Sequence, residues 1–211
     1  ALADGVTLRE GLEVHRLLRF AHAAGGVDTA EGPLHAPQVL VTAGAWSGGL
    51  LAGVGVELPV RPVRGQMMVF RAAPGGVGRI VLAAGRYVIP RRDGRIVVGS
   101  TLEDVGFDKQ TTAEARAELQ AAAARIVPAL AESPVERHWA GLRPGSPDGV
   151  PWIGPVEHVP GLFLNVGHYR NGVVLGPAAA RLVADLMLDR EPILDPAPYA
   201  VAAPRSGDYG L

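Results

Sequence analysis

The segment Gly167-His168-Tyr169-Arg170-Asn171-Gly172 joins an apolar, strand-like run to a helix-like run and could form an anion-binding turn. The first amides of a helix lack internal partners, and the helix dipole places roughly half a positive charge there. Glycine at both ends of the segment lets the backbone come close to a flat or anionic group. An ordinary strand–loop–helix connection has the same pattern, so the segment alone leaves both interpretations open.

Arg143 is a second candidate, because it follows an apolar run and precedes a loop rich in proline and glycine. A guanidinium group there can bind a carboxylate through two parallel, charge-assisted hydrogen bonds. The alternatives are a surface arginine and a simple pair with Asp148 of the same loop. Tyr87, in the strand-like segment 85–91, could offer its hydroxyl to a ligand, although a tyrosine on a strand more often serves packing.

The sequence lacks the motifs of a metal site, a serine hydrolase and a dinucleotide-binding loop. The six histidines show no metal-ligand spacing and no HExxH, so we predict no metal site. No GxSxG occurs, which argues against a serine hydrolase. Gly53-Val54-Gly55 and Gly76-Val77-Gly78 each lack the third glycine of a dinucleotide fingerprint.

The amino-acid composition further limits the class of protein to which this chain can belong. With 211 residues, 48% of them hydrophobic, the chain can bury a substantial core. The net charge is −1 and both signs are interspersed, so we expect neither a nucleic-acid partner nor a membrane surface. The absence of cysteine excludes disulfides and cysteine-linked cofactors and fits a cytoplasmic protein. No apolar run reaches the roughly 20 residues of a membrane span, and no signal peptide is visible.

The patterns predict a mixed α/β protein. Thr111 to Glu114 reads as a capping box that opens a helix ending near residue 130, and Ser47 reads as the N-cap of a helix after strand 39–42. A third helix is predicted at 173–188, and Arg92-Asp93-Gly94 is predicted as a hairpin turn. The further predicted strands are 12–20, 60–70, 86–91, 95–99, 138–142, 151–154 and 162–166.

Five segments together resemble the D-amino-acid oxidase family in order and spacing. Residues 41–47, 59–66 and 87–101 resemble the family as a whole, whereas 139–144 and 167–172 are similar to the glycine oxidases of thiamine biosynthesis. The likeness runs from about residue 6 to residue 188. It implies non-covalent FAD, a small amine or amino-acid substrate such as glycine or a small D-amino acid, an imine or 2-oxo acid product, and molecular oxygen as the acceptor. Relatives often assemble, so a homo-oligomer is possible.

The resemblance also implies a fold. The expected class is α/β (α+β), with a partial FAD-binding, Rossmann-like domain interrupted by an antiparallel-sheet substrate domain. We expect the cofactor domain at 1–57 and 139–190, the substrate domain at 58–138 and a loosely held C-terminal tail at 191–211.

Residue roles follow from the matching positions. By resemblance, Arg143 would hold the substrate carboxylate, Tyr87 would close over it and Arg170 would line the substrate side. The turn at the start of the last helix would stabilise the negative charge of a reduced flavin. The predicted cofactor contacts are Val14, Ala43, Gly44, Ala45, Trp46, Gly141, His168, Tyr169, Arg170, Asn171, Gly172, Val173 and Val174.

Two departures from the family pattern stand out. The N-terminal strand and GxGxxG segment that grip the pyrophosphate are absent, and no initiator Met is present, so we expect a fragment that holds FAD weakly or not at all and is inactive alone. Gly85 and Leu102 stand where some glycine oxidases carry larger or sulfur-bearing side chains. Two alternatives stay open: a flavin dehydrogenase that passes electrons to a carrier, and a non-catalytic module of the same fold.

Overall fold

The computed structural model describes residues 5–72 and 75–207 and divides into two compact units. One unit, here called the split unit, is built from residues up to 61 and from 144 onward. The other, here called the central unit, comprises residues 62–143. Each unit has its own hydrophobic core, and each is described separately below.

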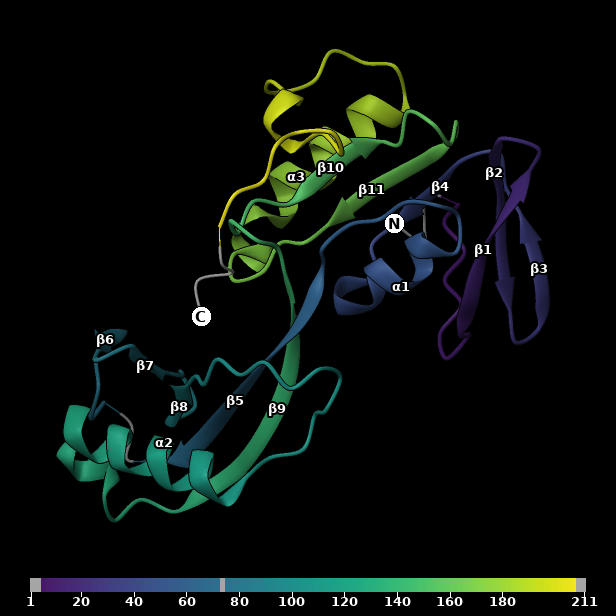
Figure 1. Ribbon diagram of the computed structural model, residues 1–211. Coiled ribbons are helices and arrows are strands. Elements are labelled where there is room, and N and C mark those ends of the chain that lie inside the picture. The colour runs from purple at the N-terminus through teal and green to yellow at the C-terminus, as the bar shows by residue number, and fades with distance from the viewer. Residues whose placement is uncertain (1–4, 73–74, 208–211) are drawn as a thin grey trace. The chain divides into compact units, whose positions relative to one another are not determined.

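The split unit is layered around a small mixed sheet with the strand order β10-β11-β4. Strand β11 (Leu162–Val166) runs antiparallel to β10 (Trp152–Pro155) and parallel to β4 (Val39–Val41). Alternate side chains of β11 enter different cores, with Leu164 on one face and Phe163 on the other, which explains why the strand is apolar throughout. Helix α3 (Gly172–Met187) packs against the Phe163 face (Figure 1).

A second layer of the split unit covers the opposite face. It contains helix α1 (Ser47–Ala52) and the antiparallel sheet β1-β2-β3, formed by Val14–Phe20, Ala23–Thr29 and Gly32–His35. Strand β2 carries Gly25 and Gly26, which have low strand propensity, and the sequence pattern did not place it. The structure requires glycine at position 26, which has φ +126° and the Leu34 carbonyl where a Cβ would stand, and the Phe20 ring lies over Gly25.

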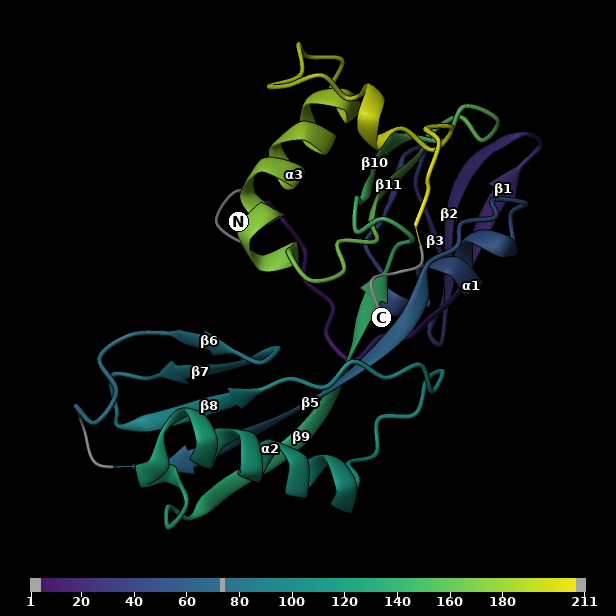
Figure 2. The ribbon, with the colours of Figure 1, turned by 60° about the vertical axis from the view of Figure 1, so that its left-hand side comes forward.

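The central unit is a five-stranded sheet, in the order β6-β7-β8-β5-β9, with one helix against it (Figure 2). The hairpin β7–β8 turns at Gly94, which has φ +84° as such a turn requires. The predicted hairpin is therefore confirmed. The elements of this unit are β5 (Arg61–Arg71), β6 (Val81–Ala83), β7 (Arg86–Pro90), β8 (Arg95–Gly99), α2 (Ala113–Ile126) and β9 (Val135–Gly145).

The two faces of this sheet have different surroundings. On β5, Met68 and Phe70 point to α2 and pack with Leu119 and Ala123 of that helix. Residues 65, 67 and 69 alternate with them and lie on the other face, here called the open face. The sheet thus has a helix-covered face for stability and an open face on which functional side chains can gather.

Three local predictions are wrong. The N-cap of α2 is Thr112, whose hydroxyl accepts a hydrogen bond from the Ala115 amide, and not Thr111. Ser47 is the first residue of α1 rather than its cap, and its buried hydroxyl makes no hydrogen bond within the described residues. The described part of the C-terminal tail, 191–207, is not loosely held, because the Arg205 guanidinium lies 5.1 Å from the Trp152 ring centroid and donates to the Pro151 carbonyl.

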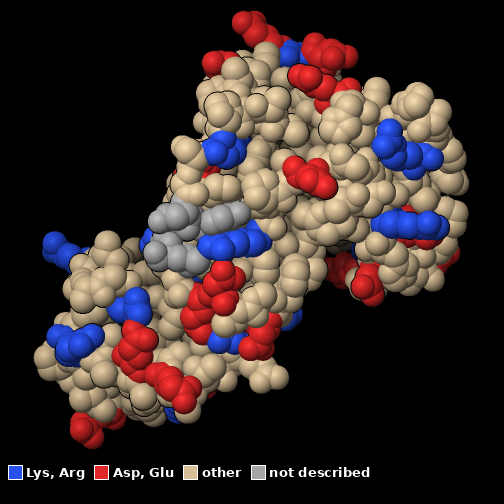
Figure 3. Space-filling view, viewed as in Figure 1, with Lys and Arg blue, Asp and Glu red and all other residues tan. Residues whose placement is uncertain are grey.

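Short 3-10 turns complete the structure, at Gly44–Trp46, Pro128–Leu130 and Ala197–Tyr199. Acidic and basic side chains are interspersed on the face drawn in Figure 3. Within the described ranges, no helix combines the length and apolarity that crossing a membrane demands. The same residues contain no group of three or more His, Cys, Asp or Glu side chains placed to hold a metal ion.

Candidate active site

Arg143, at the end of β9, presents a guanidinium group that is held only by neutral partners. Its Nη2 donates to the Ser100 hydroxyl at 2.5 Å and its Nη1 donates to the Thr101 carbonyl at 3.3 Å. The side chain is half-buried and forms no ion pair among the residues that the structure describes. A half-buried cation without a carboxylate retains its capacity to bind an anion. Asp148, the alternative partner considered from the sequence, instead accepts a hydrogen bond from the Val150 amide at 3.1 Å.

Gly65 of β5 provides the surface on which this guanidinium rests. A Cβ added to Gly65 would overlap the Arg143 guanidinium, so only glycine leaves room for it. Gly65 lies on the open face of the sheet, and Arg143 therefore lies over that face too. The sequence reasoning missed Gly65, Ser100 and Thr101, although the last two lie inside a motif that resembled the family.

Tyr87 lies on the same open face. Tyr87, Gly99 and Met67 are directly opposite one another on β7, β8 and β5, and they form one row across the sheet. The Tyr87 ring covers Gly99, and its hydroxyl donates to the Met67 sulfur at 3.8 Å. Since Gly65 and Met67 are two residues apart on one strand, the central unit brings Tyr87 and Arg143 to one face of one sheet.

Strand β9 also carries an arginine next to an aromatic ring. The Arg137 guanidinium lies 5.7 Å from the centroid of the Trp139 ring, two residues along the strand. Gly141, predicted as a cofactor contact, is exposed, and the space where its Cβ would stand is open. The contacts described above therefore place Tyr87 and Arg143 together on the open face.

In the split unit, the turn 167–172 connects β11 to α3. The His168 ring is hydrogen-bonded to the Asn165 side chain at 2.6 Å through Nε2, and burial lowers the pKa of His168. Its Nδ1 and the Tyr169 hydroxyl are buried without hydrogen-bond partners in the described part of the chain. Tyr169 has φ +47°, a left-handed conformation that non-glycine residues adopt mainly in functional or strained turns.

The first turn of α3 is unusually open. Val173 is 94% exposed and Val174 is 83% exposed, and no acidic residue lies in the first turn to offset the helix dipole. The N-cap Asn171 makes no side-chain capping bond, so the first amides of the 16-residue helix have no side-chain partner there. Arg170 is exposed and forms no hydrogen bond or ion pair with the rest of the described chain.

A separate hollow of about 220 Å³ lies beside β4 in the split unit. Val14 and Ala43, two predicted cofactor contacts, both line it. The 3-10 turn that follows contains Gly44, the buried Ala45 and the half-exposed Trp46. A larger hollow of about 450 Å³, lined by Ile153, Leu186, Ala197 and neighbouring residues, contains none of the predicted site residues.

Comparison with known proteins decides the family. Residues 1–186 match the family model described as FAD dependent oxidoreductase. The chain belongs to this family of FAD-dependent oxidoreductases. It is 57% identical to a glycine oxidase of Pseudomonas aeruginosa over 195 residues, which cover 92% of this chain and 54% of that protein. It is also 37% identical to the bifunctional protein ThiO/ThiG of a Nostoc species, over 89% of this chain and 28% of that protein.

A solved structure agrees with the family assignment. The crystal structure of glycine oxidase from Geobacillus kaustophilus superposes with a TM-score of 0.91 and 33% identity, covering 97% of this chain and 55% of that one. The mixed α/β fold with antiparallel sheets is therefore confirmed. This chain spans about half the length of the glycine oxidases it matches.

The residues of the split unit fit the cofactor of the FAD-dependent oxidoreductase family. The exposed Val173 and Val174 offer an apolar surface for a flat ring, and the uncapped amides beside them suit an anionic edge. The unpartnered Nδ1 of His168 adds a polar group at the same turn. The hollow beside Ala43 provides a second concave apolar surface.

Proposed function

We propose that this chain carries the substrate-binding and part of the FAD-binding machinery of an oxidase of glycine or another small amino acid. The observation that carries the proposal is the Arg143 guanidinium, which is fixed by Ser100 and Thr101 and pairs with no carboxylate of the described residues. A small amino acid supplies the missing carboxylate. The family assignment and the glycine oxidase relatives support the same choice.

The two units take different parts in this proposal. We assign the split unit to FAD and the central unit to the substrate. In the split unit, the 168–174 turn would hold the flavin ring, with Arg170 on its substrate side, and Val14 with residues 43–46 would hold more distant parts of the cofactor. Glycine oxidases are about twice as long as this chain, so we propose that the remaining cofactor contacts come from sequence outside it.

The proposed mechanism depends on orientation more than on acid–base chemistry. FAD held by the 168–174 turn would supply the acceptor for a hydride from the substrate α-carbon. Arg143 would fix the carboxylate through its two outward N–H bonds, so that the α-carbon has a defined position. Tyr87, on the same open face, would cover the substrate and exclude water. In this scheme neither residue needs to exchange a proton.

The decisive experiment replaces Arg143 in the natural full-length protein that contains this chain. For Arg143→Met we expect the affinity for glycine to fall by about 2–5 kcal/mol, because the substrate carboxylate is left without its partner. The measurement is the KM for glycine together with the inhibition constant of acetate. Arg137→Met is the matched control, since it removes another arginine of the same strand.

Hydrogen peroxide release during glycine turnover would support an oxidase, whereas reduction of an added quinone without peroxide would support a dehydrogenase. An Arg143→Met protein that binds glycine and acetate like the wild type would rule out the proposed carboxylate site. A purified protein without visible flavin absorbance would favour the non-catalytic module.

The ThiO/ThiG relative supports the link to thiamine biosynthesis that the motifs suggest.

A further inference from the structure

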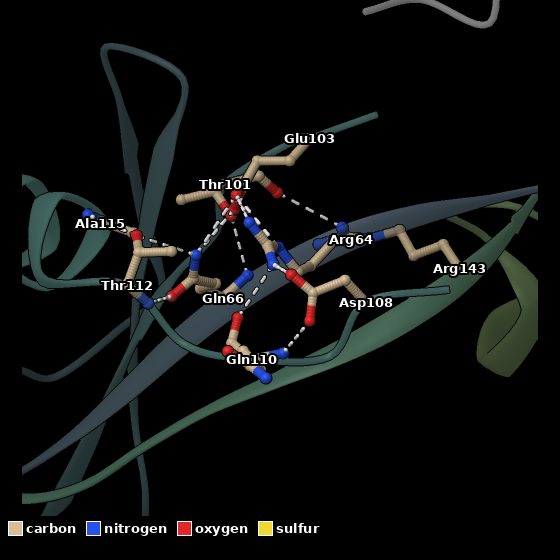
Figure 4. Close-up of polar contacts among 9 residues, drawn as sticks. All are labelled: Arg64, Gln66, Thr101, Glu103, Asp108, Gln110, Thr112, Ala115 and Arg143. Carbon is tan, nitrogen blue, oxygen red and sulfur yellow. Dashed lines mark hydrogen bonds and ion pairs between the residues drawn. The ribbon is translucent and has the colours of Figure 1, made fainter. Parts of the chain in front are cut away.

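A polar network with a buried centre lies next to the Arg143 site, in the central unit (Figure 4). Its centre is Arg64 of β5, which is 4% exposed and hydrogen-bonded to the carboxylates of Glu103 and Asp108 and to the Gln110 carbonyl. Gln66, two residues along the strand, is fully buried, and its side-chain amide oxygen accepts a hydrogen bond from the Thr112 backbone amide. Arg64 and Gln66 lie on the face opposite Gly65, so this network does not compete for the open face.

Glu103 links this network to Thr101. Its carboxylate accepts hydrogen bonds from Arg64 at 2.5 Å, from the Gln66 side chain at 3.0 Å and from the Thr101 hydroxyl. Burial raises the pKa of Glu103, but the bonds from Thr101, Arg64 and Gln66 together outweigh burial and leave that pKa below its usual value. The carboxylate is therefore charged at neutral pH and saturated with donors.

Thr101 makes hydrogen bonds through both its side chain and its backbone. Its hydroxyl accepts the Gln66 backbone amide at 2.8 Å and donates its proton to Glu103. Its carbonyl accepts Nη1 of Arg143, and the preceding Ser100 hydroxyl accepts Nη2. The two acceptors that orient the Arg143 guanidinium thus lie on a two-residue segment whose position the hydroxyl of Thr101 sets.

We infer that Glu103, acting through the Thr101 hydroxyl, is a positioning residue that holds the Arg143 guanidinium in the orientation required for carboxylate binding. This inference rests on the proposed function, in which Arg143 binds the substrate carboxylate. Glu103 touches neither substrate nor cofactor in this scheme. Its charge is balanced by Arg64, and its effect on the substrate is transmitted through hydrogen bonds to Thr101.

Asp108 provides a matched control within the same network. It is the other carboxylate bound to Arg64, but its hydrogen bonds go to Arg64 and to the Gln110 amide and do not reach Thr101. Asp108→Asn and Glu103→Gln each remove one negative charge beside Arg64. A merely structural role or a long-range charge effect would therefore act in both variants, whereas positioning acts only in Glu103→Gln.

The experiment compares Glu103→Gln, Thr101→Val, Thr101→Ser and Asp108→Asn in the flavin-loaded, full-length protein. We expect Glu103→Gln and Thr101→Val to raise the KM for glycine and the inhibition constant of acetate about tenfold. The flavin content should stay near wild type, and kcat at saturating glycine should change less than KM, because the bound carboxylate still meets the Arg143 guanidinium. Thr101→Ser, which keeps the hydroxyl, should restore wild-type KM.

Several results would overturn the inference. Tighter acetate binding in both Glu103→Gln and Asp108→Asn would show that these carboxylates act only through charge. Equal losses of affinity in both, with equal falls in melting temperature, would show a structural role. Wild-type KM in Glu103→Gln and Thr101→Val, while Arg143→Met loses affinity, would remove the positioning role alone. Wild-type KM in Arg143→Met would instead defeat the proposed function, and the inference with it.

Discussion

The Arg143 guanidinium lies on the bare backbone of Gly65, on the face of β5 opposite the α2 helix. The need for glycine at position 65 is thus linked to the proposed binding of a carboxylate by Arg143. A side chain at position 65 would fill the space that the guanidinium occupies. Glycine inside a strand costs stability relative to alanine, so its presence here is explained by the group that it accommodates.

Gly65→Ala tests this relationship directly. The added methyl group would displace the guanidinium from its bonds to Ser100 and Thr101, and we expect glycine affinity to fall by about 1–3 kcal/mol. The measurement is the KM for glycine in the full-length protein, with the melting temperature recorded in parallel. Gly78→Ala is the control, because nothing lies within 4 Å of its added Cβ. Unchanged affinity in Gly65→Ala would mean that the guanidinium can bind a carboxylate from another position.

A second prediction concerns the first turn of α3. Val173→Asp would place a carboxylate at a helix start that carries no acidic residue, and we expect it to stabilise the helix by about 0.3–1 kcal/mol. The same carboxylate would repel an anionic flavin edge and compete for the free amides, so flavin affinity should fall. The measurement is the visible absorbance of bound flavin, beside the free energy of unfolding of the apoprotein.

Leu188→Asp serves as the control for the α3 variant. Leu188 is 55% exposed at the other end of the helix, where a carboxylate opposes the dipole. We expect slightly lower stability and normal flavin content. Weaker flavin binding in Leu188→Asp than in Val173→Asp would contradict the assignment of flavin to the 168–174 turn.

Sequence patterns located most helices and strands, because the hydrophobic pattern and the turn residues agreed with the packing that the structure shows. The apolar run at 162–166 matches β11, and the turn at 92–94 joins β7 to β8 as predicted. Strand β2 was missed because Gly25 and Gly26 lower strand propensity for a reason visible only in three dimensions, namely the close approach of Phe20 and Leu34. Ser47 and Thr111 were misassigned because each has the composition of a cap one residue away from the actual helix boundary.

The candidate site was only partly accessible to sequence reasoning. Arg143 and Tyr87 stood out by type and by family resemblance, and the structure places both on one face of the five-stranded sheet. The partners of Arg143 could not be found in the same way, because Ser100 and Thr101 are about 40 residues distant and are brought near it by strand pairing. The role of Glu103 depends on which face each residue of β5 occupies, and that register has no signal in a single sequence.

The corrected N-cap of α2 leads to a third prediction. Thr112→Ala removes the hydroxyl that accepts the Ala115 amide, and we expect the free energy of unfolding to fall by about 0.5–2 kcal/mol. Thr111→Ala, one residue earlier and exposed, should change it by less than about 0.5 kcal/mol. Chemical denaturation of both variants measures the difference. The opposite ranking would restore Thr111 as the cap.

The last prediction concerns acid stability and His138 of β9. Burial, and then the positive charge of Arg116 on α2, lower the pKa of His138, and its Nε2 has no hydrogen-bond partner among the described residues. The folded protein therefore favours the neutral ring, whereas the unfolded chain takes up a proton near pH 6.5. Stability from this group is present above that pH and is lost as the pH falls through the lower pKa of the folded state.

We therefore expect the free energy of unfolding to decrease between pH 7.5 and pH 5.5, and His138→Gln to reduce that decrease because glutamine does not titrate. Urea denaturation at the two pH values measures both quantities. If His138→Gln and the wild type lost the same free energy of unfolding on acidification, protonation of the His138 ring would not be coupled to unfolding. The pH dependence would then have to come from other groups, such as His168, because burial also lowers the pKa of that residue.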